Sequence, residues 1–361
     1  MTESANPLPP RLGAQLTPTR RRTLIYWLWL GAALTFCLVV VGGATRLTQS
    51  GLSMVEWEPL VGVLPPLSEQ QWNDAFALYQ QYPEYIQLRP DMTLAEYKFI
   101  YYWEYAHRML ARTIGLVFLL PFLFFWWKGY LDKRLAGRLL VLFGLGALQG
   151  LMGWLMVASG LIDRPSVAHE RLAAHLLLAF TIFGYCLWTA ADLRARPAAP
   201  LASRAVRGWS LAFGVILVAQ VAYGAFVAGL HAGLAFNTYP LMGGGWLPPG
   251  GWRLEPPLLN LLDNIATVQW IHRTLPVILL LIALGLLVHA LRQRRRPGGG
   301  SDLGWATVLA GGVLLQGALG VATLLSFVAL DLALFHQAVA LLLFGAWVLW
   351  HHRVSRSQAL T

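Results

Sequence analysis

The chain has 361 residues, of which 57% are hydrophobic and only 12% charged, and its mean hydropathy is +0.55. This composition is typical of an integral membrane protein and excludes an ordinary soluble domain. The formal net charge of +10 does not indicate binding to nucleic acid, because the basic residues gather in alternate loops between apolar segments.

Eight apolar runs are long enough to cross a membrane as helices, since about 20 apolar residues span the hydrocarbon layer. The runs cover residues 24–44, 104–127, 137–159, 169–190, 208–230, 265–291, 303–327 and 330–350. The sequence therefore predicts an all-α integral membrane fold with eight transmembrane helices.

The basic residues predict the orientation of these helices, because cytoplasmic loops are enriched in lysine and arginine. Arginines and lysines cluster in the tail 1–23, in the linker 191–207, in two other alternate loops, and in the tail 351–361. We therefore expect both termini in the cytoplasm and the long loop 45–100 outside. The first apolar run is of full length and is expected to remain as an anchor instead of being cleaved.

The loop 45–100 carries its own helix signals. Ser68 followed by Gln71 is a capping-box pattern, and a second helix is expected from Thr93 into the second span. The aromatic residues of this loop are typical of a membrane interface. Its acidic residues, Glu84 among them, are predicted to form a solvated face.

Two halves of the chain repeat one another. Gln149 to Gly153 in the third span matches Gln316 to Gly320 in the seventh, and His175 and His336 each stand eight residues before a Phe-Gly pair. Each half holds four spans, so the repeat preserves orientation. This pattern predicts two parallel-repeat four-helix bundles, 24–190 and 208–350, related by a pseudo-two-fold axis along the membrane normal.

Four histidines occupy matched places in the two halves: His107, His175, His272 and His336. An ionisable residue within a membrane is costly and is a functional candidate by default. The predicted topology places all four near the outer face, and two imidazoles facing each other across a bundle fit the axial positions of a haem iron. Zinc usually needs three or four protein ligands, which are not evident here. Simple hydrogen bonds between helices remain the alternative.

Glu104 is the sharpest difference between the halves. It stands three residues before His107 and so on the same helix face, whereas the matching position in the second half is Gln269. A carboxylate beside an apolar pocket can move protons. An ion pair with Arg108 or Arg112 fits the spacing equally well.

Three arginines lie close to the histidines in sequence: Arg108, Arg171 and Arg273. Each guanidinium could bind a propionate carboxylate of a haem. The alternative is that these side chains reach the lipid headgroups.

The remaining histidines give weaker signals. His169 is six residues before His175, about 240° around the helix, and is expected at most to line an entrance. His231 is expected to make an outer-loop contact, and three others are predicted to be solvated on the cytoplasmic side: His289, His351 and His352. Cys37 and Cys186 lie in apolar runs and are expected to be small buried hydrophobes.

Taken together, these motifs resemble the haem A synthase family over residues 24–350. The motifs are Gly42-Gly43-Ala44-Thr45-Arg46-Leu47-Thr48, Ser50-Gly51-Leu52-Ser53, Glu104-Tyr105-Ala106-His107-Arg108, Arg171-Leu172-Ala173-Ala174-His175, Ala228-Gly229-Leu230-His231-Ala232-Gly233, Asn237-Thr238-Tyr239-Pro240, His272-Arg273 and His336-Gln337.

The resemblance implies an oxidoreductase that oxidises a methyl group of haem O to a formyl group, giving haem A for terminal oxidases. The C-terminal half would bind the iron of a haem b cofactor through His272 and His336. The N-terminal half would bind the iron of the substrate haem O near His107 and His175, with Glu104 as the catalytic carboxylate. Arg108 and Arg273 are the expected contacts to the haem carboxylates.

The N-terminal segment holds Glu3 and several prolines and would make a poor mitochondrial presequence, so a bacterial inner membrane is the expected location. Haem O synthase or an oxidase assembly factor is a candidate protein partner, and the electron partner, the oxygen source and a homo-oligomer stay open. Some family members carry a cysteine pair in the first outer loop, whereas the loop 45–100 has none, which excludes a thiol route for electrons through it.

Two other functions remain compatible with the residues. One is a di-haem b-type electron-transfer cytochrome, which would need no Glu104. The other is a transporter, because parallel repeats are common among transporters.

Overall fold

The computed structural model describes residues 12–56, 63–161, 165–194, 204–294 and 299–356. Within these ranges the secondary structure is helical apart from one isolated bridge between Met242 and Gly245. The α-helices are α1 (Pro18–Leu47), α2 (Glu69–Tyr79), α3 (Pro83–Leu88), α4 (Leu94–Trp127), α5 (Lys133–Leu161), α6 (His169–Leu193), α7 (Arg204–Gly229), α8 (Ile265–Gln293), α9 (Gly299–Leu325) and α10 (Leu330–Arg356), and two short 3-10 helices are η1 (Ala232–Leu234) and η2 (Pro257–Leu261).

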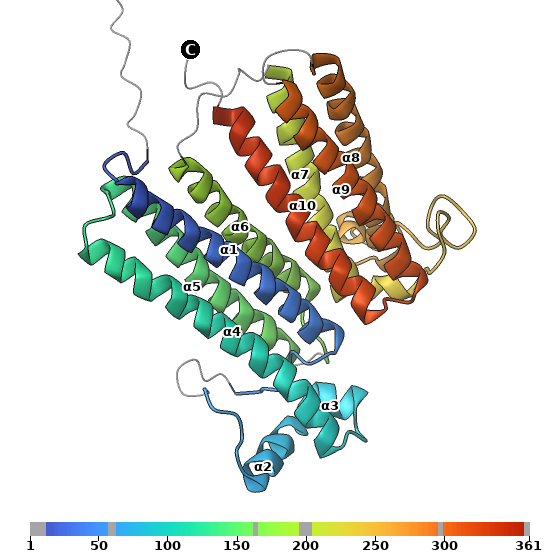
Figure 1. The fold of residues 1–361 in the computed structure, drawn as a ribbon. Helices are drawn as coiled ribbons and strands as arrows, with labels where there is room; N and C mark the ends of the chain where they lie inside the picture. Colours follow the sequence, from blue (N-terminus) through green and yellow to red (C-terminus); the bar gives the residue numbers. More distant parts are fainter. Residues whose placement is uncertain (1–11, 57–62, 162–164, 195–203, 295–298, 357–361) are drawn as a thin grey trace, which may run out of the picture.

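Eight helices in the described ranges are long and apolar enough to cross a membrane, which confirms the predicted multi-pass all-α fold. Helices α1, α4, α5 and α6 pack together, and helices α7 to α10 form a second group beside them (Figure 1). Helix α6 packs against both α7 and α10, and α1 also touches α10. The contacts therefore agree with two four-helix bundles joined along α1, α6, α7 and α10.

The two Phe-Gly pairs of the sequence repeat meet at this junction. A methyl group added to Gly184 would lie 2.9 Å from the Phe344 ring, and one added to Gly345 would lie 2.8 Å from the Phe183 ring. Each glycine thus makes room for the phenylalanine of the other half. This reciprocal contact is what a two-fold relation between the halves produces, because equivalent residues then face each other across the axis.

The two ends of the bundle differ in what they carry. Helices α2 and α3 and the connection between α7 and α8 lie at one end, here named the loop end (Figure 1). Helix α1 begins and α10 ends at the opposite end. The first and last spans therefore enter and leave from the same side, as an even number of spans requires.

Several helices extend beyond the apolar runs that predicted them. Helix α1 begins at Pro18, after the N-cap Thr17, and α10 continues to Arg356. Helix α4 begins at Leu94, where the Thr93 side chain and Glu96 form a capping box. Hydropathy detects only the length of a helix that lies within the hydrocarbon layer. The polar turns beyond that layer are stabilised by caps. The central part of the predicted linker 191–207 lies outside the described residues.

The extension of α4 holds the outer loop in place. The predicted capping box at Ser68 is confirmed and begins α2. Trp72 and Tyr79 of α2 pack with Tyr97 and Tyr101 of α4, and the Tyr79 and Tyr97 rings stack with centroids 5.2 Å apart. These aromatic residues form a small core of their own. The loop is thereby fixed over the N-terminal bundle at the point where Glu104 lies.

Candidate functional site

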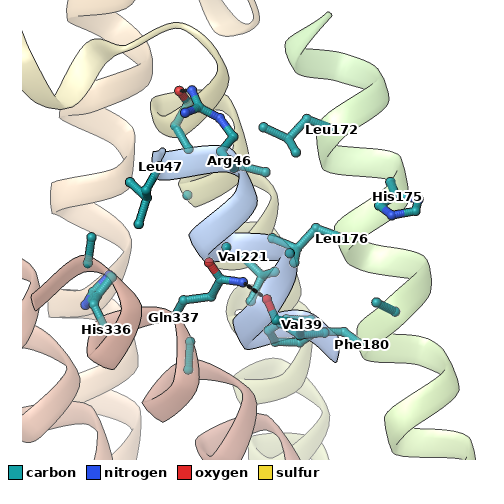
Figure 2. Close-up of a pocket in the computed structure, with 18 of the residues that line it drawn as sticks. Val39, Arg46, Leu47, Leu172, His175, Leu176, Phe180, Val221, His336 and Gln337 are labelled. Carbon is teal, nitrogen blue, oxygen red and sulfur yellow. Dashed lines mark hydrogen bonds between the residues drawn. The ribbon is translucent and has the colours of Figure 1, made fainter. Parts of the chain in front are cut away.

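One cavity of about 1290 Å³ runs through both bundles and is lined by all four histidines. It is larger than the ~300–1,000 Å³ of a typical small-molecule site. Helix α1 passes between His175 of α6 and His336 of α10 (Figure 2). There the Gln337 side chain donates a hydrogen bond of 2.8 Å to the Val39 carbonyl of α1. The two histidine pairs therefore belong to adjoining parts of one space, with α1 as the wall that separates them.

His272 of α8 and His336 of α10 face each other in the C-terminal half. Their ring centroids lie 6.3 Å apart, with the ring planes at 80°. Two imidazoles on opposite sides of one metal ion, with bonds of about 2 Å, would have ring centres roughly 6 Å apart. The pair is thus spaced as axial ligands of a single metal ion would be.

His107 of α4 and His175 of α6 form the N-terminal pair. Both side chains are half-buried and open onto the cavity. The Nδ1 atom of His175 is buried and has no hydrogen-bond partner among the described residues. Within the same residues, no group of three or more histidine, cysteine, aspartate or glutamate side chains comes together. The histidines thus stand as pairs, and no set of protein ligands for zinc is formed there.

Each of the four imidazoles packs against a glycine of a neighbouring helix. A methyl group added to that glycine would approach the ring to between 3.0 and 3.2 Å, so a larger residue would displace the histidine. The glycine and histidine partners are Gly42 with His107, Gly153 with His175, Gly224 with His272, and Gly320 with His336.

Three of the imidazoles are also held by a glutamine placed four residues before the glycine. Gln149, Gln220 and Gln316 each donate through Nε2 to the backbone carbonyl of their histidine, at 3.2, 3.1 and 2.9 Å. The same atom lies 3.0–3.3 Å from a ring nitrogen. The sequence repeat contained two of these glutamines without revealing their role. The third, Gln220, was missed, although the spacing Gln-x-x-x-Gly would have found it.

Glu104 is buried, with an exposed fraction of 3%, and its carboxylate is fully engaged. One oxygen accepts from the Ser53 hydroxyl at 2.8 Å and from the Met54 backbone N–H at 2.9 Å. The other accepts from Nη2 and Nε of Arg108 at 2.6 and 3.1 Å. The predicted ion pair with Arg108 is therefore present, and it lies on the cavity wall beside His107. Ser53 was not identified as a contact from the sequence.

The matching corner of the C-terminal half has the Gln269 amide in the place of the carboxylate. The Gln269 amide donates to the Phe236 carbonyl at 3.3 Å, and Arg273 donates to the Phe236 and Thr238 carbonyls at 2.5 and 2.7 Å. The Nε atom of Arg273 is buried and has no partner among the described residues. Both arginines therefore anchor the outer loop of their own half, and both also line the cavity.

A second carboxyl group lines the same part of the cavity. Glu84 of α3 is only 5% exposed and accepts a hydrogen bond of 3.2 Å from the Tyr79 hydroxyl. Burial raises the pKa of Glu84 to about 7, against the opposing effects of Arg89 and Tyr79. The prediction that this residue belongs to a solvated face was wrong, because α3 folds back over the bundle.

Other predicted site residues lie elsewhere. Arg171 donates to the Leu155 carbonyl at 2.6 Å and so ties α6 to α5. His169 is buried, with its Nε2 atom 3.3 Å from an Asp263 carboxylate oxygen, and it packs against Gly229 of the other half. His231 is exposed and lies on the rim of the cavity.

Of the three histidines predicted to be solvated at the end opposite the loop end, His289 is exposed, but His351 and His352 need correction. His352 lies 2.8 Å from the Asp192 carboxylate, which also pairs with Arg138 and Arg356. His351 lies 2.9 Å from the Ser210 hydroxyl. The contacts of Asp192 with His352 and Arg356 join α6 of one bundle to α10 of the other, which hydropathy alone does not indicate.

The two cysteines differ in their surroundings. Cys186 is buried, as expected, whereas Cys37 is exposed on the outer surface of α1. A residue can lie inside an apolar run and still face outward, because lipid surrounds a membrane helix on its exposed side.

The fold and the cavity define a multi-pass membrane protein in which a repeated four-helix framework presents two pairs of histidines to one space. Residues 25–348 match the family described as cytochrome oxidase assembly protein. The heme A synthase of Bradyrhizobium sp. (strain ORS 278) is 47% identical over 94% of this chain and 93% of its own length. The heme A synthases of Rhodospirillum centenum and Nitrosospira multiformis are 46% and 45% identical, over 94% and 93% of this chain and 91% and 94% of their own lengths. The chain therefore belongs to this family, which it shares with heme A synthases.

Proposed function

We propose that this protein is an oxidoreductase that converts haem O to haem A by oxidising one porphyrin methyl group to a formyl group. Its relatives are heme A synthases along nearly their whole length. The observation that carries the assignment to particular residues is the asymmetry of the cavity. A buried carboxylate, Glu104, stands beside His107, whereas the matching corner of the other half holds the neutral Gln269.

The C-terminal half is the proposed site of a haem b cofactor, which His272 and His336 would hold through its iron. The separation of 6.3 Å between their rings suits ligation of one iron. Arg273 has a buried Nε–H without a partner among the described residues, which suits a propionate carboxylate. When bound, a haem of this kind supplies one-electron redox chemistry.

The N-terminal half is the proposed site of the substrate, held between His107 and His175. Arg108 fixes the position of Glu104 through two hydrogen bonds and leaves it on the cavity wall. Oxidation of a methyl group releases protons, and Glu104 is the group placed to accept them. Ser53, bonded to the same carboxylate, is placed to share the proton.

The proposed location is a bacterial inner membrane, with both termini in the cytoplasm. The first and last spans begin and end at the same side of the bundle, and arginines cluster there in the first turns of α1 and the last turns of α10. A tag fused to either terminus should react with a labelling reagent only after the membrane is opened. Labelling of intact cells would reverse this orientation.

Haem extraction from membranes of cells that make haem O tests the activity. Expression of the protein should replace haem O with a formyl-bearing haem. Unchanged haem O with two low-spin haems per chain would instead indicate an electron-transfer cytochrome, and a purified protein without haem absorption would indicate a transporter.

A pair of matched variants tests the asymmetry. Glu104→Gln should abolish haem A formation while leaving the C-terminal haem bound, and Gln269→Leu, at the matching position of the other half, should still form haem A. Full activity of Glu104→Gln would contradict the role given to this carboxylate.

A further inference from the structure

The contacts that hold the four histidines, here called the histidine cradles, are alike except at one position. In three of them a glutamine and a glycine, spaced four residues apart on a neighbouring helix, hold one imidazole. Residues four apart share one helix face, so both reach the same ring. His107 rests on Gly42 of α1, but the residue four positions before Gly42 is Leu38, which lines the cavity.

The glutamines are suited to fix an imidazole that binds iron. A metal-bound histidine normally donates its second ring N–H to an acceptor, which sets the orientation of the ring. The Nε2 atoms of Gln149, Gln220 and Gln316 lie 3.0–3.3 Å from a ring nitrogen, and the Oε1 atoms of the same amides are buried without a partner among the described residues. Leucine has no such group. Within the described residues, no side-chain amide contacts the His107 ring.

We propose that His107 is the displaceable axial ligand of the N-terminal site, and that Leu38 is the specificity-determining residue that leaves it displaceable. This inference rests on the proposed function, in which His107 and His175 bind the iron of the substrate. An iron with two histidine ligands has no open position. Release of His107 would leave one position on the iron open to a small ligand such as carbon monoxide, whereas His175, held by Gln149, would stay bound.

The position of Leu38 indicates that only the N-terminal half has a displaceable histidine. It is matched by Gln220 in the C-terminal half, because Gly42 and Gly224 contact equivalent histidines. The leucine therefore replaces the glutamine in the half that contains Glu104, and not in the half that would hold a permanent cofactor. A haem that only passes electrons can keep both ligands, whereas exchange of one ligand would open a position on the iron of the substrate.

Carbon monoxide binding to the reduced, full-length protein tests the proposal, because carbon monoxide binds ferrous haem only where an axial position opens. The purified protein should contain two haems per chain, measured after extraction, and one of the two should bind carbon monoxide. Leu38→Gln should weaken that binding about tenfold, the effect of one added hydrogen bond in a buried site. Leu38→Met, which matches leucine in size without an amide, should bind like the unaltered protein.

Two further variants keep the test decisive if Leu38→Gln folds poorly. Gln220→Leu should make the second haem bind carbon monoxide as well, because it copies the Leu38 arrangement into the other half. His107→Ala should retain the N-terminal haem in a five-coordinate, high-spin form.

The outcomes separate the two hypotheses. Two haems per chain with carbon monoxide binding unchanged in both Leu38→Gln and Gln220→Leu would overturn this inference and leave the proposed function intact. A protein that never holds a second haem would overturn the proposed function itself, and the inference with it.

Discussion

Replacement of Glu104 by glutamine should destabilise the protein as well as inactivate it. The carboxylate accepts four hydrogen bonds from three residues, Ser53, Met54 and Arg108. Glu104 is buried and Arg108 is largely shielded from solvent, with side-chain exposed fractions of 3% and 12%. Removal of one partner of a buried ion pair costs about 3–5 kcal/mol, because the other charge is left without compensation. Arg108 keeps the Met54 and Glu56 carbonyls as acceptors, so we expect the lower end of this range, about 3 kcal/mol.

The assay is a double-mutant cycle on thermal unfolding in detergent, followed by tryptophan fluorescence. Glu104→Gln and Arg108→Met should each lower the free energy of unfolding, and the double variant should lose less than both added together. The coupling should be about 2 kcal/mol, which lies within the range for residues in direct contact. Haem A formation should be lost in the double variant even where its stability recovers.

Gln269→Leu is the matched control in the other half. It removes one hydrogen bond of 3.3 Å to the Phe236 carbonyl and leaves Arg273 with its own carbonyl acceptors, so the expected loss is about 1 kcal/mol. Additive effects of the Glu104 and Arg108 variants, to within about 0.5 kcal/mol, would refute the reasoning, because they would show that the pair is not coupled.

Three further predictions concern the cofactor, a titrating carboxyl and the bundle core. His272→Ala should remove the low-spin absorption of the C-terminal haem, and an unaltered haem content would contradict its assignment as a ligand. Burial raises the pKa of Glu84 from 4.5 to about 7, so between these pH values the folded protein keeps a proton that the unfolded chain has released. The free energy of unfolding should therefore fall as the pH rises from about 4.5 to 7. Glu84→Gln should flatten the dependence of the melting temperature on pH. Gly214→Ala should destabilise by about 3 kcal/mol, because the added methyl would lie 1.9 Å from the rigid Trp347 ring, whereas Gly208→Ala on the same helix meets nothing within 4 Å and should melt near the unaltered protein.

The sequence predicts the membrane framework well because lipid imposes a simple rule on it. Every spanning segment must be a long apolar helix, so hydropathy alone locates all eight. The ends of the helices follow another rule, since caps such as Thr93 and polar turns such as the start of α1 lie outside the apolar layer. The apolar runs therefore fell short of the helix ends by about six residues at the start of α1 and at the end of α10, whereas the helix signal at Thr93 predicted the extension of α4.

The histidines were predictable for the same reason, since an imidazole in an apolar run stands out. Their supports were predictable only in part. The Gln-x-x-x-Gly spacing marks Gln220 but does not reveal its contact with His272, and Glu84 lies in a loop whose folding back over the cavity depends on packing among Tyr79, Tyr97 and Trp72. Contacts of this kind join segments far apart in the chain, and periodicity within one segment carries no information about them.

The two departures from internal symmetry point to one place. Glu104 replaces a neutral amide, and Leu38 replaces a glutamine that would hold the ring, and both changes surround His107. The C-terminal half keeps a glutamine at each of the corresponding positions, Gln220 and Gln269, together with two clamped histidines. A duplicated haem-binding bundle needs these two kinds of change to become reactive: one ligand that can leave, and one charged group to take up protons. If His107 proved as firmly bound as His272, the N-terminal half would be a second electron-transfer site, and Glu104 would serve only to anchor the outer loop.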